Sequence, residues 1–323
     1  MRLCLGNQWC SRSDFVFDLE DFKPLTLADK ETFDAHYAKH PPNHSENVFS
    51  TLVSWGHFVQ AYYLIHGENM LIMTMPDDQP RFRPPSGPRD SKVFRRLFEL
   101  AKDSGTDYLM VLVDNETKDW LSNAFKCGDF IPHRDYYDYV YLAKDLANLE
   151  GKPYLKIRNK INKFNRMFDH NVESMCHKNI DEIRQFLNRW CLWKDCESDP
   201  LLENERIAVM HSMKHCFELD LCGLAIRIDG EIQAVTVFEP MNPETAVVHF
   251  EKAMPDFDGL YQVINQEAAK YIAKEKKFIN RQSDLGIPGL RTAKERYHPH
   301  HMVEVYHMVS GCEEIEEAVP EHY

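Results

Sequence analysis

The predicted strands and helices follow one order twice along this chain of 323 residues. Period-two and period-3.6 hydrophobic patterns predict that each half ends with a strand, a helix, a strand, a helix and a strand. Strands that alternate with helices indicate mixed α/β structure. We therefore expect an α/β (α+β) fold of two similar domains, residues 1–150 and residues 151–323. A basic linker helix over residues 152–168 should begin the second domain.

Local signals set the expected elements. A turn at Gly67 joins two strands, an Asp229-Gly230 turn joins a hairpin, and Asn179 with Glu182 is spaced as a capping box. In the first half we expect strands at 57–65, 69–75 and 108–113, mostly strand over 130–142, and helices at 91–104 and 116–125. In the second half we expect strands at 171–176, 224–228, 232–238, 246–251, 278–281 and 301–309, and helices at 181–193, 203–219 and 260–274.

The charge of the chain is acidic overall and uneven. A net charge of −13 argues against general binding to DNA or to an anionic membrane surface. The acidic excess lies at 195–205 and at 313–321, with five carboxylates in each segment. A basic stripe without acids suits a selective contact with a polyanion, and a solvated helix between domains is the alternative. Its six cations are Lys152, Lys156, Arg158, Lys160, Lys163 and Arg166.

The chain lacks the sequence signals of membrane insertion and secretion. No apolar run approaches the ~18–20 residues that a membrane span needs, and the first residues lack the apolar core of a signal peptide. We therefore expect a cytoplasmic location without stable membrane insertion. The nine cysteines are odd in number and form no CxxC, so we expect reduced thiols.

Metal and cofactor signatures are weak. Cys191, Cys196, His211 and His215 are spaced like zinc-finger ligands, but they fall in separate predicted elements, so we expect no metal. The chain has no G-x-S-x-G elbow, no G-x-G-x-x-G and no Walker A sequence. The loop at 254–259 has one glycine and two acids, which makes a poor cradle for a pyrophosphate. We therefore expect no bound cofactor.

The segment from Asn280 to Pro299 concentrates polar residues around a Gly-Ile-Pro-Gly turn at residues 286–289. Asp284 precedes the turn, and Pro288 suits a first helical position. Arg291 and Lys294 then fall on one helical face. A helix N-terminus carries partial positive charge and free N–H groups, so this unit can hold an anion or a developing oxyanion. A turn followed by a solvated surface helix is the alternative.

A second polar group lies nearby in the predicted sheet. Glu251 and Lys252 end a strand and should point to opposite faces. Asn265 belongs to the next helix. It is either a helix-surface residue or a substrate contact, because burial would require hydrogen-bond partners.

Three segments resemble the soluble relatives of the C-terminal domain of phosphatidylglycerol lysyltransferase. They are His249-Phe-Glu-Lys-Ala, Gly259-Leu-Tyr-Gln-Val-Ile-Asn-Gln-Glu and the whole segment 280–299. The resemblance extends from about Phe22 to Val309 and implies two tandem GNAT-like acyltransferase domains with mixed central sheets. It also implies similarity to Fem-type peptidyltransferases, which take their aminoacyl group from aminoacyl-tRNA. The lysyltransferases modify a lipid headgroup and carry a multi-span membrane half, which is not expected here, and the acidic surface opposes docking on anionic lipid.

The resemblance and the local patterns together give candidate site residues. We expect the catalytic residues to be Lys294, Arg291, Asp284 and Glu251. Lys294 and Arg291 would face an oxyanion or a phosphate, Asp284 would orient Arg291 or bind the α-amino group, and Glu251 would be the base. We expect the substrate-binding residues to be Tyr261, Asn265, Asn280, Tyr297 and His298. The six cations of the basic stripe would contact the acceptor stem of tRNA.

The expected function is transfer of an aminoacyl group from aminoacyl-tRNA to an amine or hydroxyl acceptor. One alternative is an N-acyltransferase that uses acetyl-CoA or another acyl-CoA, against which the missing glycine loop counts. Another is a catalytically degenerate GNAT-like binding protein, since the first half lacks an equivalent of residues 284–294. The acceptor, the transferred group, the oligomeric state and the catalytic half stay open.

Overall fold

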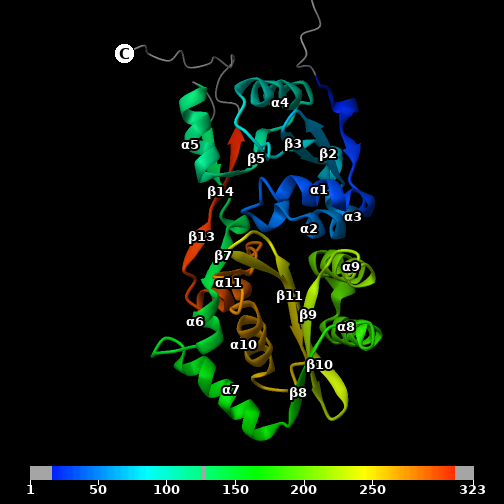
Figure 1. Cartoon of the computed structure of the whole chain (residues 1–323), viewed down its shortest axis with the longest axis vertical. Coiled ribbons are helices and arrows are strands. Elements are labelled where there is room, and N and C mark those ends of the chain that lie inside the picture. Colours follow the sequence, from blue (N-terminus) through cyan, green and yellow to red (C-terminus); the bar gives the residue numbers. More distant parts are fainter. Residues whose placement is uncertain (1–16, 126–128, 310–323) are drawn as a thin grey trace, which may run out of the picture.

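The computed structural model describes residues 17–125 and 129–309 (Figure 1). The acidic segment 313–321 lies outside the described residues, as do Cys4, Cys10, Cys127 and Cys312. The molecule is elongated, with most of the first half at one end and most of the second half at the other. None of the helices in the described part is long and apolar enough to cross a membrane.

The first half contains two antiparallel sheets. One has the order β1-β2-β3-β4 and the other the order β5-β14-β6, in which β14 is Val305–Val309. Helix α4 packs its apolar face, which includes Phe94 and Leu97, into the core that these sheets share. The strands are β1 Lys23–Pro24, β2 Ala61–His66, β3 Asn69–Thr74, β4 Arg81–Phe82, β5 Tyr108–Asp114 and β6 Asp129–Pro132. The helices are α1 Lys30–Tyr37, α2 Phe49–Ser54, α3 Gly56–Val59, α4 Ser91–Asp103 and α5 Asn115–Ala124.

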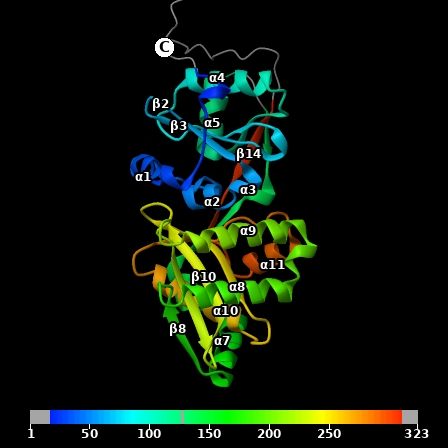
Figure 2. The same ribbon diagram turned by 90° about the vertical axis from the view of Figure 1, so that its right-hand side faces the viewer.

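The second half is built on one sheet of seven strands, in the order β13-β7-β12-β11-β10-β9-β8. Helices α8 and α9 cover one face, and α6, α7 and α10 cover the other (Figure 2). The strands are β7 Asp138–Leu142, β8 His170–Ser174, β9 Cys222–Ile228, β10 Glu231–Pro240, β11 Thr245–Ala253, β12 Phe278–Asn280 and β13 His301–Val303. The helices are α6 Ala143–Asn148, α7 Leu155–Met167, α8 Ile180–Lys194, α9 Pro200–Lys214, α10 Leu260–Ile272 and α11 Pro288–Glu295.

Two strands cross between the halves. β7 precedes residue 150 but pairs with β12 and β13, whereas β14 (Val305–Val309) ends the described chain and pairs with β5 and β6. Residues 130–142, expected to be mostly strand, contain β6 and β7, which lie in different sheets. The single strand predicted at 301–309 is wrong, because β13 and β14 also lie in different sheets. The division at residue 150 stays a prediction. The pairing shows that each half receives a strand from beyond it.

Other local predictions differ from the structure in defined ways. The strand predicted at 57–65 begins at Ala61, because residues 56–59 form α3 and Gln60 then takes a left-handed φ of 43°. The basic helix begins at Leu155 rather than at residue 152. The capping box at Asn179 does not form, because its Oδ1 accepts from the backbone N of Cys176. The hairpin of β9 and β10 is confirmed, with Asp229 and Gly230 at φ values of 50° and 85°.

Cys191 and Cys196 form a disulfide, so the expectation of reduced thiols is wrong for this pair. Asp195 takes a left-handed φ of 56° at the end of α8 and turns the chain back toward the last helical turn. The disulfide engages two of the four residues with zinc-finger spacing. Within residues 17–125 and 129–309, no three His, Cys, Asp or Glu side chains gather as a metal site.

The central strand β11 carries an irregularity that positions the site. Its antiparallel pairing with β10 shifts between Val248 and Phe250, which leaves His249 as an extra residue, a β-bulge. Val248 therefore packs in the core on the α10 face, and Phe250 packs in the core on the α8 and α9 face. Beyond the bulge Glu251 faces α10 and Lys252 faces α9, which confirms the predicted opposite faces.

The parallel pairing of β11 with β12 is short. Only residues 245–247 of β11 pair with residues 278–280 of β12, and β11 then continues to Ala253 without this neighbour. The two strands therefore part at their carboxyl ends, where ligands bind in open α/β sheets. Glu251 and Arg281 lie at this opening, which we call the β11–β12 fork (residues 248–253 and 281–286).

Candidate functional site

Glu251 is the centre of a polar cluster at the β11–β12 fork. Its Oε1 accepts a hydrogen bond of 2.9 Å from Asn265 Nδ2 on α10, and its Oε2 accepts one from Arg281 Nη2. Its side chain is 10% exposed, and Asn265 is 3% exposed. The cluster therefore joins β11, α10 and the residue that follows β12, and Asn265 is not a surface residue of its helix.

Arg281 was not among the residues predicted for the site. Its guanidinium carbon lies 4.9 Å from the ring centroid of Tyr297 and 5.8 Å from that of Tyr141. Burial by itself lowers the pKa of Arg281, but Glu251 and the two tyrosines outweigh it and raise that pKa. The sequence signal was its place at the end of the strand predicted at 278–281.

Two atoms of this cluster are buried without a hydrogen-bond partner in the described structure. They are Nη1 of Arg281, a donor, and Oδ1 of Asn265, an acceptor. Buried polar atoms in proteins almost always have a partner. Both residues hold the same carboxylate with their other atoms, so the unsatisfied donor and acceptor belong to one small site. A ligand that offers one acceptor and one donor would satisfy both.

Asp284 is fully buried and is held from several sides. It accepts hydrogen bonds from Arg291 through Nε and Nη2 (both 2.9 Å), from Arg134 (3.1 Å), from the Tyr139 hydroxyl (2.6 Å) and from the Gly286 backbone N (2.9 Å). Burial alone raises the pKa of Asp284, but the bonds from Arg291, Tyr139 and Gly286 outweigh it and hold that pKa well below its ordinary value. The carboxylate thus fixes Arg291, as one of its two predicted roles requires.

Lys294 holds the turn that follows β12. Its Nζ donates to the backbone carbonyls of Arg281 (2.7 Å), Gln282 (3.1 Å) and Ser283. An ammonium has three hydrogens, so this geometry leaves none for an oxyanion. Burial, together with the nearby charge of Arg281, lowers the pKa of Lys294 to about 7.

The same turn needs its glycine. Gln282 and Leu285 have left-handed φ values of 58° and 51°, and Gly286 has 72°. A Cβ on Gly286 would lie 2.8 Å from Oδ2 of Asp135. Backbone of this kind persists where the surroundings determine it, and here Lys294 and Asp284 supply those contacts.

The remaining predicted substrate residues do not all meet at Glu251. Tyr297 does, through its ring against Arg281. Asn280 is fully buried and donates to Asp138 (2.7 Å). The Tyr261 hydroxyl accepts from Trp190 (3.2 Å), and His298 packs on the ring of Tyr154 (5.4 Å between centroids).

The predicted basic stripe lies on and just before α7, which packs against α10 (Figure 1). Five of its six cations are exposed: Lys152, Lys156, Lys160, Lys163 and Arg166. Lys160 and Lys163 pair with Asp258 at 3.6 and 3.0 Å. Arg158 is partly buried and instead donates to the carbonyls of Leu149 and Gly151.

A serine, a histidine and a glutamate meet at the bulge, which sequence reasoning missed. His249 Nε2 lies 2.7 Å from Glu239, and the Ser50 hydroxyl on α2 also donates to Glu239. Ser50 lies 3.2 Å from the same Nε2 atom. In a catalytic triad the hydroxyl and the carboxylate meet different ring nitrogens. This group therefore ties α2 of the first half to the bulge rather than forming a hydrolytic triad.

Comparison with known proteins gives one family and several similar structures. The family described as "Phosphatidylglycerol lysyltransferase, C-terminal" matches residues 37–309. A conserved protein of unknown function from Bacteroides thetaiotaomicron VPI-5482 is 32% identical, with a TM-score of 0.83, over 90% of this chain and 99% of that one. L-PGS from Bacillus licheniformis is 15% identical, with a TM-score of 0.58, over 87% and 91% of the two chains.

A third similar structure is FemX, which is 8% identical, with a TM-score of 0.56, over 85% of this chain and 95% of that one. At such identities, the likeness to L-PGS and FemX shows the fold alone. The expected α/β fold is confirmed by these structures and by the strand order, and the seven-stranded sheet is mixed because β11 and β12 pair in parallel.

Proposed function

The chain belongs to the family of the phosphatidylglycerol lysyltransferase C-terminal domain, and from that premise we propose that it transfers an aminoacyl group from aminoacyl-tRNA to an amine or hydroxyl acceptor. The observation that carries the proposal is the unsatisfied donor of Arg281 and the unsatisfied acceptor of Asn265, the two residues that hold the carboxylate of Glu251. The proposal concerns the second half of the chain, where these residues lie.

The chemistry of an α-aminoacyl ester matches this pair of atoms. The ester carries an ammonium, which donates, beside a carbonyl oxygen, which accepts. Oδ1 of Asn265 and the carboxylate of Glu251 would receive the ammonium, and Nη1 of Arg281 would donate to the carbonyl. The acceptor's nitrogen or oxygen then attacks the carbonyl carbon, and the negative charge gathers on the oxygen beside Arg281. A fixed cation in a buried site stabilises that oxyanion.

The second step completes the transfer. The bond between the carbonyl carbon and the ribose oxygen breaks, the ribose oxygen takes a proton, and the attacking atom loses one. Both oxygens of Glu251 already accept hydrogen bonds from Asn265 and Arg281. We therefore assign Glu251 to the ammonium of the donor in place of the predicted role as a base.

Lys294, Asp284 and Arg291 act through other residues in this proposal. Lys294 fixes the carbonyls of the turn that presents Arg281. Asp284 and Arg291 fix the following residues of the same turn. All three are positioning residues, which differs from the predicted contact of Lys294 and Arg291 with an oxyanion or phosphate.

The nucleic-acid part of the donor would lie along α7. This helix packs on α10, which carries Asn265, so a polyanion on α7 approaches the helix that supports the site. Phosphates would compete with Asp258 for Lys160 and Lys163. Because phosphate contacts release counterions, this binding should weaken steeply as salt increases.

Filter binding with charged and deacylated tRNA, at low and physiological salt, tests the proposal. We expect preference for charged tRNA in the unmodified protein. Asn265→Leu should remove that preference while leaving binding of deacylated tRNA unchanged. Neutralising Lys156, Lys160 and Lys163 to Gln should weaken binding of both tRNA forms and reduce the salt dependence.

The matched control neutralises three other exposed lysines, Lys144, Lys178 and Lys214, and should change little. Absence of tRNA binding at both salt concentrations would contradict the proposal. Tight binding of an acyl-CoA in that case would support the acyl-CoA alternative.

A further inference from the structure

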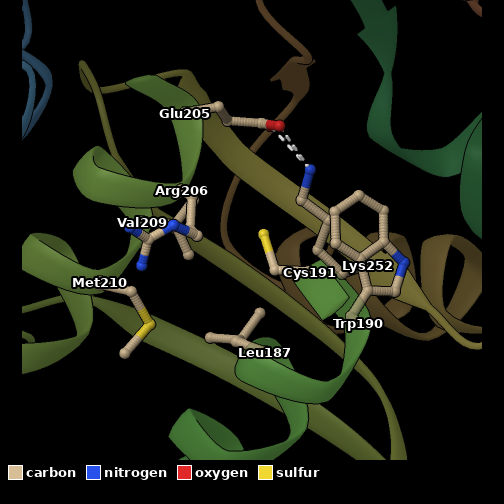
Figure 3. A pocket seen from close by; sticks show the side chains of 8 residues that line it. All are labelled: Leu187, Trp190, Cys191, Glu205, Arg206, Val209, Met210 and Lys252. Carbon is tan, nitrogen blue, oxygen red and sulfur yellow. Dashed lines mark hydrogen bonds and ion pairs between the residues drawn. The ribbon is translucent and has the colours of Figure 1, made fainter. Parts of the chain in front are cut away.

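A hollow that is open to solvent lies on the α8 and α9 face of β11 (Figure 3). Its wall is mainly apolar and includes Leu187, Val209 and Met210. Its polar end is formed by Lys252, Glu205 and the ring of Trp190. Lys252 follows Glu251 in the sequence but faces the opposite side of the sheet, so the hollow is separate from the cluster at the β11–β12 fork.

Two cations line this hollow: Arg206, which pairs with Glu203, and Lys252, which is fixed in place. Lys252 is 9% exposed, and its Nζ lies 4.2 Å from the ring centroid of Trp190, a cation–π contact. The indole is itself held, because its Nε1 donates to the Ala253 carbonyl (3.1 Å) and to the Tyr261 hydroxyl (3.2 Å). The ammonium therefore rests on an aromatic ring that cannot easily turn away.

Glu205 is the member of this ion pair that a ligand can replace. Both carboxylate oxygens of Glu205 accept from Lys252 Nζ at 2.8 Å, as Figure 3 shows. The Glu205 side chain is 30% exposed, against 11% for Lys252. Glu205 comes from the surface of α9 and can rotate into solvent, where a carboxylate is well hydrated. Lys252 has no such path, because its stem belongs to the buried strand.

We propose that this hollow binds a short aliphatic carboxylate. The carboxylate of the ligand replaces Glu205 on Lys252, and its chain packs against Leu187, Val209 and Met210. The exchange makes and breaks no covalent bond. It conserves the ion pair at the buried cation and adds apolar burial. A ligand ammonium would instead have to displace Lys252 from Trp190 and leave that cation buried without a partner, which is costly.

Calorimetric titration with hexanoate, and with hexylamine as the cationic probe of equal length, tests this proposal. Hexanoate should bind the unmodified protein. Glu205→Gln removes the internal competitor and should tighten binding of hexanoate about fivefold. Glu218→Gln is the matched control, because Glu218 pairs with His215 and does not line the hollow, and it should leave the affinity unchanged.

Two further variants locate the ligand. Lys252→Met keeps an apolar stem on Trp190 and should weaken binding about ten- to a hundredfold. Val209→Phe fills the apolar wall, leaves the ion pair in place and should also weaken binding, so the test does not depend on one variant. Binding of hexylamine that Glu205→Gln abolishes would overturn the proposal. Absence of hexanoate binding to Glu205→Gln at millimolar concentration would also overturn it. So would an affinity for hexanoate that is the same in the unmodified protein and in all variants.

Discussion

Replacement of Asp284 by Asn tests whether this residue supports the fork or performs chemistry. The substitution keeps the size of the side chain and one oxygen acceptor. It removes the charge and turns one oxygen into an NH2 group that faces donors. Arg134, Tyr139 and Arg291 would then donate toward a neutral side chain. The new NH2 group would face one of these donors, which it cannot accept from.

The magnitude follows from the burial of the pair. Asp284 is fully buried, and breaking a buried ion pair by removing one partner costs about 3–5 kcal/mol. The side chains of Arg134 and Arg291 are 38% and 33% exposed, so water can reach both cations in the variant. We therefore expect Asp284→Asn to lower the free energy of unfolding by about 2–4 kcal/mol, which is somewhat less than the loss of a fully buried ion pair.

Urea unfolding at several pH values measures this loss. The folded state lowers the pKa of Asp284, so the unfolded state binds the proton more readily. The stability from Asp284 is complete above the unfolded pKa, about 3.9, and declines as the pH falls below it. The difference between the unmodified protein and Asp284→Asn should therefore be constant from pH 7 to about pH 5 and should narrow below about pH 4.

Asp135→Asn is the matched control. Asp135 also accepts from Arg291, at 2.9 Å, but its side chain is 52% exposed. Such a pair contributes at most about 1 kcal/mol. The reasoning is refuted if Asp284→Asn costs no more than Asp135→Asn, or if the difference from the unmodified protein does not narrow in acid.

Four other changes have defined outcomes in thermal or urea unfolding. Lys294→Met takes the donor from three carbonyls and should cost about 1–3 kcal/mol. Gly286→Ala should destabilise by about 1–2 kcal/mol because of its φ of 72° and the contact with Asp135. Gly289→Ala, where a Cβ meets nothing within 4 Å, should be neutral or stabilising within α11. Trp190→Phe should cost about 1–2 kcal/mol, since it removes an indole donor.

Elements with a strong periodicity of their own could be predicted from the sequence. The apolar faces of α8 and α10 and the turn between β9 and β10 are local signals, and the structure contains all three. Periodicity does not tell which sheet a strand joins. Residues 301–309 read as one strand, yet β13 pairs with β7 and β14 pairs with β5 and β6. That choice depends on partners about 160–200 residues away in the chain.

The site was predicted in part for the same reason. Sequence patterns identified Glu251 and Asn265 as polar groups near a strand end, and the structure brings them together. They also favoured Lys294 as a free cation, because its hydrogen bonds to three carbonyls of the turn after β12 leave no trace in helical spacing. Asp284 accepts a hydrogen bond from Arg134, which lies 150 residues earlier in the sequence. Whether a polar side chain is occupied is a tertiary property, and this is why Arg281, with its unsatisfied atom, was missed.

The bulge at His249 decides which face of the sheet each of the two sites occupies. If His249 took a regular strand position, Glu251 would point toward α8 and α9, and Lys252 would point toward α10. Glu251 would then lose Asn265, and Lys252 would lose both Trp190 and Glu205. His249 is held by Glu239, and Glu239 also accepts from Ser50 on α2 of the first half. The first half, which lacks a counterpart of residues 284–294, therefore contributes to the fork by fixing the irregularity that gives both neighbouring side chains their faces.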